Sequence, residues 1–332
     1  MKTNCFLFLA LALCPGPAAL FAQAPASRPL SFFQYLAPGE ATALELSTDV
    51  SALMAGKKTN TYQPGVLTTA GGKSFAVEVR PRGKFRRKIA PVPPLKVKTK
   101  KKLLLAEGLD TLNEVKLALP CYLDQRGDEL VIKEYLIYRM FEAICPSAAR
   151  AQLVNLTLIN TGTGNEAKYT VKAILLEDEE EIASRLNGTV VESYGMTIDS
   201  LEPDQAALTA VFQYMVGNTD WNIAEQRNVR FIRGQNDRML LIPFDFDFAG
   251  FVNAPYATPT AGLGLRSVRE HYLMADGFNA ESIKRAFRKL TDHQPDFINL
   301  CRSGALSPTA ARSAASYIET FFTDLLQAEK GK

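Results

Sequence analysis

The chain has 332 residues, with 38 Lys and Arg against 35 Asp and Glu and a formal net charge of +3. This near-neutral balance gives no nucleic-acid signature. Two histidines and five cysteines exclude a His-rich zinc site and a disulfide scaffold and leave little material for a Ser-His-Asp mechanism. Any chemistry must therefore use carboxylates, amides and lysines. The length suits two lobes.

The N-terminus has the pattern of a secretory signal peptide. Lys2 precedes an apolar run, Cys5–Leu13, and small residues follow as far as Ala22. We therefore predict a signal peptide at residues 1–22 and a flexible leader at residues 23–30. No run reaches the roughly 20 apolar residues of a membrane helix. The sequence thus predicts an exported monomer without a transmembrane segment, located in the periplasm or outside the cell.

The first half of the mature chain is rich in short strands. Alternating apolar residues and Gly- or Pro-rich turns predict an antiparallel meander, and apolar residues at helical spacing before Pro146 predict one main helix. Two further alternating runs follow this helix. The expected elements are strands at Ala43–Leu46, Ser74–Arg80 and Leu95–Thr99, a helix at Asp128–Ile144, and strands at Gln152–Ile159 and Lys168–Leu176.

The second half is mainly helical. An acidic run opens a short helix that ends near Leu186, Pro203 begins a long helix that ends at Gly217, and the tail from Glu281 is helical with a break near Ser307. One hairpin, Asn228–Arg233 with Met239–Phe244, interrupts the helices. This order predicts an α+β fold with a β-rich N-lobe (31–176) that carries one main helix and a mainly helical C-lobe (177–332).

The hairpin brings polar residues to one point. If Arg233 pairs with Met239, Asn228 and Asp245 emerge at the same open end of the hairpin. Asp220 lies in the loop that leads into the first strand. An amide oxygen and carboxylates that converge in this way suit Mg²⁺ or Mn²⁺ with bound phosphate oxygens, and a remaining carboxylate can accept a proton.

The same segment resembles a known family. Gly217-Asn218-x-Asp220, then Asn228, and Pro243-Phe-Asp245-Phe-Asp247 are similar to the catalytic and metal motifs of the spore-coat-protein-H (CotH-like) atypical kinases, and more remotely to those of HipA-like and phosphoinositide kinases. The resemblance implies a bilobal, protein-kinase-like fold and phosphoryl transfer from ATP. It also implies that Asp220 is the catalytic base, that Asn228 and Asp245 bind the metal, and that Asp247 is a candidate second ligand.

The resemblance extends upstream to the residues that would hold the nucleotide. It includes the basic-glycine motif that ends in Lys84, and it places the hinge between the lobes at Glu177-Asp178. Separately, Glu134 lies in the apolar stripe of the main helix, where a carboxylate needs a cationic partner. In kinases such a Glu pairs with a strand Lys that binds the phosphates, and Lys96 or Lys98 can take this role here.

Three functions are compatible with this pattern. The first is an exported, metal-dependent kinase that transfers phosphate from ATP to a protein or small-molecule hydroxyl; the acceptor is not readable from the sequence. The second is a catalytically silent pseudokinase that acts as a binding or scaffold protein. The third is a nucleotide-sugar transferase that uses Asp245-x-Asp247 to hold the diphosphate, although the parallel βαβ region that would favour it is not found in the sequence.

Overall fold

The computed structural model describes residues 28–39, 42–162 and 167–330. The expected signal peptide (1–22) and most of the expected leader (23–30) lie outside the described residues. Within the described ranges, no helix combines the length and the apolar character that crossing a membrane requires.

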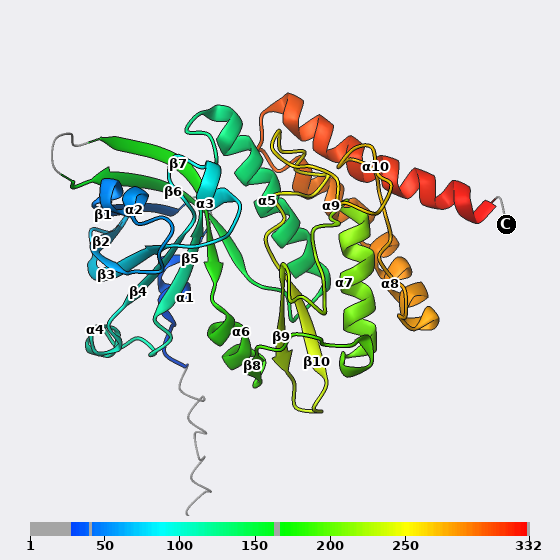
Figure 1. Cartoon of the computed structure of the whole chain (residues 1–332), viewed down its shortest axis with the longest axis horizontal. Coiled ribbons are helices and arrows are strands. Elements are labelled where there is room, and N and C mark those ends of the chain that lie inside the picture. Colours follow the sequence, from blue (N-terminus) through cyan, green and yellow to red (C-terminus); the bar gives the residue numbers. More distant parts are fainter. Residues whose placement is uncertain (1–27, 40–41, 163–166, 331–332) are drawn as a thin grey trace, which may run out of the picture.

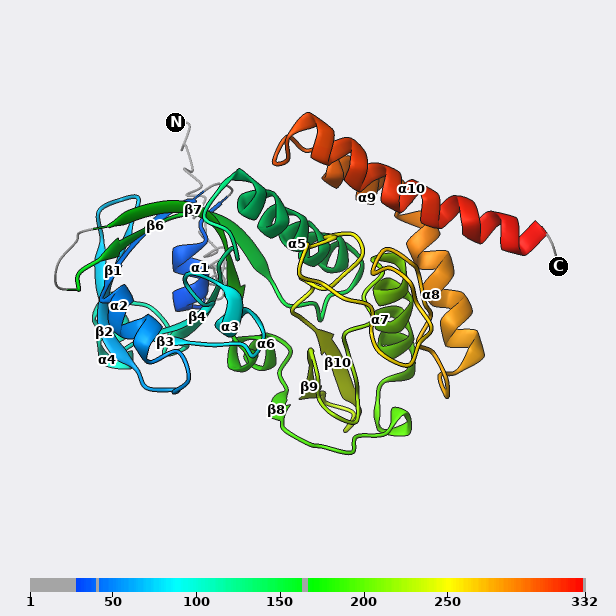
Figure 2. The same ribbon diagram turned by 45° about the horizontal axis from the view of Figure 1, so that its top comes forward.

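Seven strands form a closed barrel in the first half of the chain (Figure 2). Their order around the barrel is β1-β2-β3-β4-β5-β7-β6. Neighbours pair antiparallel except where β1 meets β6 in parallel and closes the ring. The strands are β1 (Thr42–Thr48), β2 (Gln63–Thr69), β3 (Ser74–Pro81), β4 (Leu95–Thr99), β5 (Glu114–Ala118), β6 (Ala151–Asn160) and β7 (Lys168–Glu177).

This barrel makes the expected bilobal, protein-kinase-like fold wrong. The predicted strands exist, and β3 pairs antiparallel with β4 as the meander required. The pairing that closes the ring joins Thr42 to Val154, more than a hundred residues apart along the chain. Nothing in the local alternation of apolar residues specifies such a distant parallel partner, so the closure could not be anticipated from the pattern.

The barrel has its own hydrophobic core. Inward-facing residues alternate along each strand, as the side-chain period of two requires, and Leu46, Val79 and Leu117 are fully buried among them. Helix α1 (Phe32–Leu36) joins this core, with the Phe32 ring edge-on to that of Phe75 at 5.3 Å. Short helices lie between the strands: α2 (Val50–Ala55), α3 (Arg86–Ile89) and α4 (Lys101–Ala106).

The second part of the molecule is mainly helical and lies beside the barrel (Figure 1). Helix α5 (Gln125–Ile144) shares one hydrophobic core with the helices of this part. The other elements are α6 (Glu179–Arg185), β8 (Thr189–Val191), the 3-10 helix η1 (Ile198–Ser200), α7 (Pro203–Met215), β9 (Val229–Arg233), β10 (Met239–Pro243), α8 (Ala280–Asp292), α9 (Gln294–Cys301) and α10 (Pro308–Lys330).

Several local predictions are confirmed. The main helix ends at Ile144 as expected but begins at Gln125, because the Asp124 side chain accepts a hydrogen bond from the Gly127 amide at 2.9 Å and caps it. The hairpin has the expected register, with Arg233 opposite Met239. The structure adds β8 as a third strand beside β9 and a further break at His293 in the C-terminal helices.

Candidate functional site

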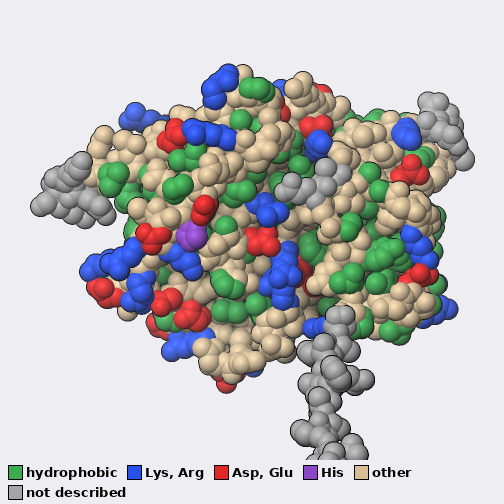
Figure 3. Space-filling view, turned by 180° about the vertical axis from the view of Figure 1, so that it is seen from behind, with side chains coloured by type: hydrophobic (Ala, Val, Ile, Leu, Met, Phe, Trp, Pro, Cys, Tyr) green, Lys and Arg blue, Asp and Glu red, His purple; other side chains and the backbone are tan. Residues whose placement is uncertain are grey.

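A cleft of about 1270 Å³ lies between the barrel and the second part of the molecule. Its two walls differ in their predominant charge. The barrel wall supplies mostly cations, from β3, β4, β5 and the segment around α3, with Glu114 as an exception. The opposite wall supplies mostly carboxylates, from α6, the segment after β8 and the hairpin region, with Arg227 and Arg230 as exceptions. Basic and acidic side chains are instead interspersed on the described part of the face shown in Figure 3. The partial separation of charge is therefore a property of the cleft.

The open end of the β9–β10 hairpin contributes the residues expected there. The Asn228 side-chain amide donates to the Asp220 backbone carbonyl at 2.7 Å and to its carboxylate at 2.9 Å. Phe244 donates its backbone N–H to the Asn228 carbonyl at 3.1 Å, so the hairpin continues to this point. Gly217, at φ +65°, begins the loop after α7. The predicted convergence of Asp220 and Asn228 is confirmed.

Two of these residues have an uncommon backbone conformation. Asn228 (φ 52°) and Asp245 (φ 61°) lie in the left-handed region, as does Gln226 (φ 50°) in the same loop. Asn and Asp tolerate this region better than most residues, but it is still sparsely populated. Such positions cluster at functional sites, where the surrounding structure holds them in place. The backbone N–H of Asp245 is fixed by the Tyr138 hydroxyl of α5 at 2.9 Å.

Arg86, Glu134, Asp245 and Asp247 form what we call the arginine cluster. Arg86 binds both carboxylate oxygens of Glu134, at 2.8 and 3.1 Å, and contacts Asp245 through its Nη2. Its Nε lies 3.3 Å from Asp247. Glu134 does need a buried cationic partner, but the expectation that Lys96 or Lys98 fills this role is wrong. An arginine suits the position better because its planar fork engages several carboxylates at once.

Burial and charge set the pKa values in this cluster. Burial raises the pKa of Asp247 to about 8 despite Arg86, with the carboxylates of Asp245 and Glu134 adding to the rise. Burial also raises the pKa of Glu134. At Asp245 burial acts in the same direction, but the Arg86 guanidinium holds the pKa below its usual range. Burial and the neighbouring carboxylates therefore act against ionisation of Asp247, whereas Arg86 favours the ionised form of Asp245.

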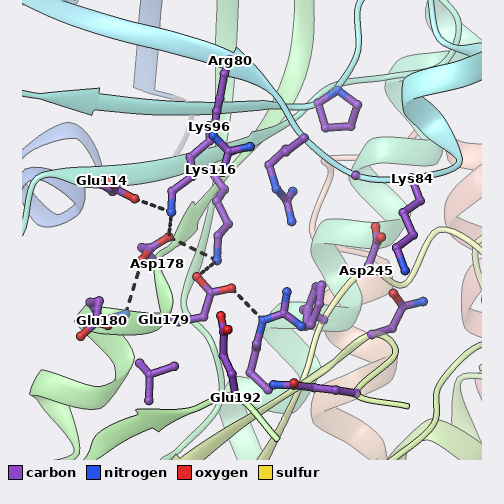
Figure 4. Close-up of a pocket in the computed structure, with 18 of the residues that line it drawn as sticks. Arg80, Lys84, Lys96, Glu114, Lys116, Asp178, Glu179, Glu180, Glu192 and Asp245 are labelled. Atoms are coloured by element: carbon purple, nitrogen blue, oxygen red, sulfur yellow. Dashed lines mark hydrogen bonds and ion pairs between the residues drawn. The ribbon is translucent and has the colours of Figure 1, made fainter. Parts of the chain in front are cut away.

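Lys96, Lys116, Asp178 and Glu179 form a second group, the lysine cluster (Figure 4). Both lysines lie 3.4 Å from Asp178, and Lys116 also pairs with Glu179. Burial lowers the pKa of Lys116, although the two carboxylates oppose it. At Lys96 burial is outweighed, and Asp178 raises the pKa. This cluster links barrel strands β4 and β5 to the start of α6.

A third feature is a row of cations, Arg80, Arg82 and Lys84, at alternate positions at the end of β3. All three line the cleft, and none has a carboxylate within ion-pair distance among the described residues. Gly83, at φ +79°, permits the turn between the last two. The charge of Arg82 acts on both clusters, because it lowers the pKa values of Asp245 and Lys116. We call these three residues the cation row.

The remaining predicted residues are distributed around this site. Lys98 lines the cleft but pairs with Glu78 at 3.2 Å, away from Glu134. Asp178 lines the cleft and caps α6, where it accepts from the Glu180 amide. Glu177 does not line the cleft. It forms an ion pair with Arg185 at 2.8 Å instead.

Sequence reasoning missed three charged residues of the site. Arg86 could have been inferred, because Glu134 requires a cation and Arg86 lies two positions after the end of the basic-glycine motif. Lys116 lies on β5, a strand that the alternation did not reveal, and Glu179 was assigned only to an acidic helix start. Both belong to the site because β5 pairs with β7, the strand that leads into α6, and no local signal reports this pairing.

The arrangement does not provide a ready site for a divalent cation. Among the described residues no group of three or more His, Cys, Asp or Glu side chains is placed to hold a metal ion. Asp245 and Asp247, the expected ligands, both contact Arg86. Asn228 directs its amide nitrogen at Asp220. The Mg²⁺ or Mn²⁺ site therefore stays a prediction.

Comparison with protein-family models found no match. Comparison with curated proteins found none either.

Proposed function

We propose that this protein is an exported phosphotransferase that takes a phosphoryl group from a nucleoside triphosphate such as ATP and passes it to a hydroxyl of a protein or small molecule. The observation that carries the proposal is the placement of Asp220 and the cation row in one cleft. The cleft, at about 1270 Å³, exceeds the roughly 300–1,000 Å³ of a typical pocket for one small molecule. It has room for a donor and an acceptor together.

Asp220 has the properties of a general base. Burial raises its pKa, although the Arg227 guanidinium at 3.4 Å opposes this, and the nearby Asp245 charge adds to the rise. A carboxylate with a raised pKa is a stronger proton acceptor. The Asn228 amide donates to its carboxylate and orients it. In the proposed step Asp220 takes the proton of the acceptor hydroxyl while the hydroxyl oxygen bonds to the γ-phosphorus and the bond to the β-phosphate oxygen breaks.

The cation row is suited to the other half of this reaction. Negative charge accumulates on the departing diphosphate, and positively charged side chains that lack carboxylate partners can stabilise it. Among the described residues, Arg82 and Lys84 have no carboxylate partner to give up before they bind a phosphate. Lys96 and Lys116 differ in this respect, because each already pairs with Asp178 and with one further carboxylate, Glu114 or Glu179.

The test is a pair of measurements on the purified wild type and on Asp220→Asn. Binding of ATP is followed by calorimetry, and transfer is followed with radiolabelled ATP and a mixture of co-secreted proteins. We expect Asp220→Asn to keep its affinity and to lose about 10²–10⁴-fold in transfer rate, the usual contribution of a general base. Asp237→Asn makes the same change at the exposed turn of the same hairpin and should leave both quantities unchanged.

A second candidate is a binding protein without transferase activity. The observation in its favour is that Arg86 already neutralises the acidic pair, Asp245 and Asp247, that a catalytic metal would use. The same contacts weigh against the nucleotide-sugar transferase, which needs both carboxylates for the diphosphate metal. ATP binding without detectable transfer in the wild type would select the binding protein over the phosphotransferase.

A further inference from the structure

We propose that Arg86 takes the place of a divalent cation in this cleft, so that the protein binds the phosphate chain of its ligand without a metal ion. The inference rests on the proposed function, since it concerns how the same cleft holds a triphosphate. The two aspartates expected to bind Mg²⁺ contact an arginine of the protein itself.

The guanidinium contacts carboxylates through all three of its nitrogens. Nη1 and Nη2 bind the two oxygens of Glu134, Nη2 also contacts Asp245, and Nε faces Asp247. Three carboxylates therefore surround one fixed positive charge, as carboxylates surround a cation in a metal site. The Arg86 side chain is 6% exposed, so solvent does not compete for these contacts.

Arg86 cannot readily yield this position to a metal ion. Glu134 is 2% exposed and has no second cation within ion-pair distance among the residues that the structure describes. If Arg86 withdrew, Glu134 would be left as a buried, uncompensated charge, which is strongly unfavourable. If Arg86 stayed, an entering dication would face a like charge and an Asp245 oxygen that is already engaged. Either route opposes metal binding.

The cation row supplies the charge that a metal would otherwise bring to the phosphates. Arg82 and Lys84 both line the cleft with Asp245 and lack carboxylate partners in the described part of the chain. In Figure 4 Lys84 lies on the same side of the cleft as Asp245, whereas Lys96 and Lys116 converge on Asp178 at the other side. Arginine and lysine bind phosphate oxygens through charge-assisted hydrogen bonds, so a triphosphate can be held by side chains alone.

The first experiment uses the full-length wild type and inorganic tripolyphosphate, titrated by calorimetry in EDTA and in Mg²⁺. We expect binding in EDTA, with affinities in the two buffers that differ by less than about threefold. Binding seen only with Mg²⁺ overturns this inference and leaves the proposed function standing. Binding in neither buffer overturns both.

The second experiment removes the buried charges as a pair. Arg86→Met with Glu134→Gln frees Asp245 and Asp247 without leaving an unpaired Glu134. We expect this variant to bind Mn²⁺ at least about tenfold more tightly than the wild type, measured by the loss of the free-ion paramagnetic signal. Equal Mn²⁺ affinity in the folded variant and the wild type overturns the inference. If the variant does not fold, Mn²⁺ binding by the wild type is measured instead. Binding that is lost in Asp245→Asn contradicts the inference, and a wild type that does not bind Mn²⁺ supports it.

Discussion

The arginine cluster and the lysine cluster lie on opposite sides of the same cleft, and they compensate their carboxylates in different ways. In the arginine cluster one guanidinium serves three carboxylates and is almost fully buried. In the lysine cluster two ammonium groups share Asp178, and Arg230 adds a contact to Glu179 at 3.0 Å. Among the described residues, Arg86 is the one cation within ion-pair distance of the carboxylates in the first cluster. In the second cluster Asp178 and Glu179 each contact two cations.

This difference separates a fixed site from an adjustable one. Loss of Arg86 leaves Glu134 without compensation, so the arginine cluster holds one geometry. Lys96 and Lys116 are compact charges on flexible chains, and each contacts more than one carboxylate, so an anion can draw one away while the other remains. We therefore expect the arginine cluster to determine stability and the lysine cluster to respond to ligands.

The largest expected effect is that of Arg86→Met. The variant leaves Glu134 buried without a partner, and removing one member of a buried pair typically costs about 3–5 kcal/mol of unfolding free energy. Urea unfolding followed by circular dichroism measures it. The exposed Lys88→Met in the same helix should cost less than about 0.5 kcal/mol. A small loss for Arg86→Met, equal to that of Lys88→Met, would mean that the arginine cluster does not stabilise the fold.

Lys116→Met should cost less, about 1–3 kcal/mol, the usual penalty for a buried polar group that loses a partner. Lys96 still contacts Asp178 and Arg230 still contacts Glu179, so each carboxylate keeps a cationic partner. The same urea titration gives the comparison. If Lys116→Met destabilised the protein as much as Arg86→Met, the remaining cations would not compensate Asp178 and Glu179. The two clusters would then not differ in how they tolerate the loss of a cation.

Arg82→Ala should leave stability nearly unchanged and weaken tripolyphosphate binding by about tenfold, or roughly 1.4 kcal/mol. Arg82 has no carboxylate partner in the described ranges, so its removal leaves no carboxylate without a counter-ion. Calorimetry on the variant and on Lys57→Ala, which lies outside the cleft lining, makes the comparison. Equal affinities for the two variants would remove the cation row from the binding site.

The smallest expected effect concerns Glu181, a buried carboxyl that has no cation within ion-pair distance in the described part of the chain. Ser31 donates a hydrogen bond to one of its oxygens, and burial raises its pKa to about 7. Between about pH 4 and 7 the folded protein therefore binds this proton while the unfolded chain, with a Glu pKa of about 4.3, has released it. This contribution lowers stability as the pH rises through that window.

Glu181→Gln removes this dependence. We expect the variant to match the wild type at pH 5 and to melt a few degrees higher at pH 8, because a gain of about 1 kcal/mol raises Tm by about 2–4 °C in a domain of 150–250 residues. Glu180→Gln, at the exposed neighbouring position, should follow the wild type at every pH. A constant difference between Glu181→Gln and the wild type across this range would contradict a raised pKa.

Much of the local structure was readable from the sequence. The hairpin register, the long helix after Pro203 and the helix that ends at Ile144 follow from short-range periodicity and capping, and all are confirmed. The same local geometry brought Asp220 and Asn228 together, since they are only eight residues apart in the loop that leads into β9. The buried Glu134 was also predicted correctly, together with its need for a cation.

The overall architecture and the ion partners were decided only by the tertiary structure. Barrel closure pairs β1 with β6 across more than a hundred residues, and a strand's alternation shows which face is buried but not which distant strand it meets. The partner of Glu134 depended in the same way on the placement of α3 against α5. Sequence periodicity fixes the direction of a side chain within its own element, whereas ion pairing depends on distances between elements, and these exist only after the chain has packed.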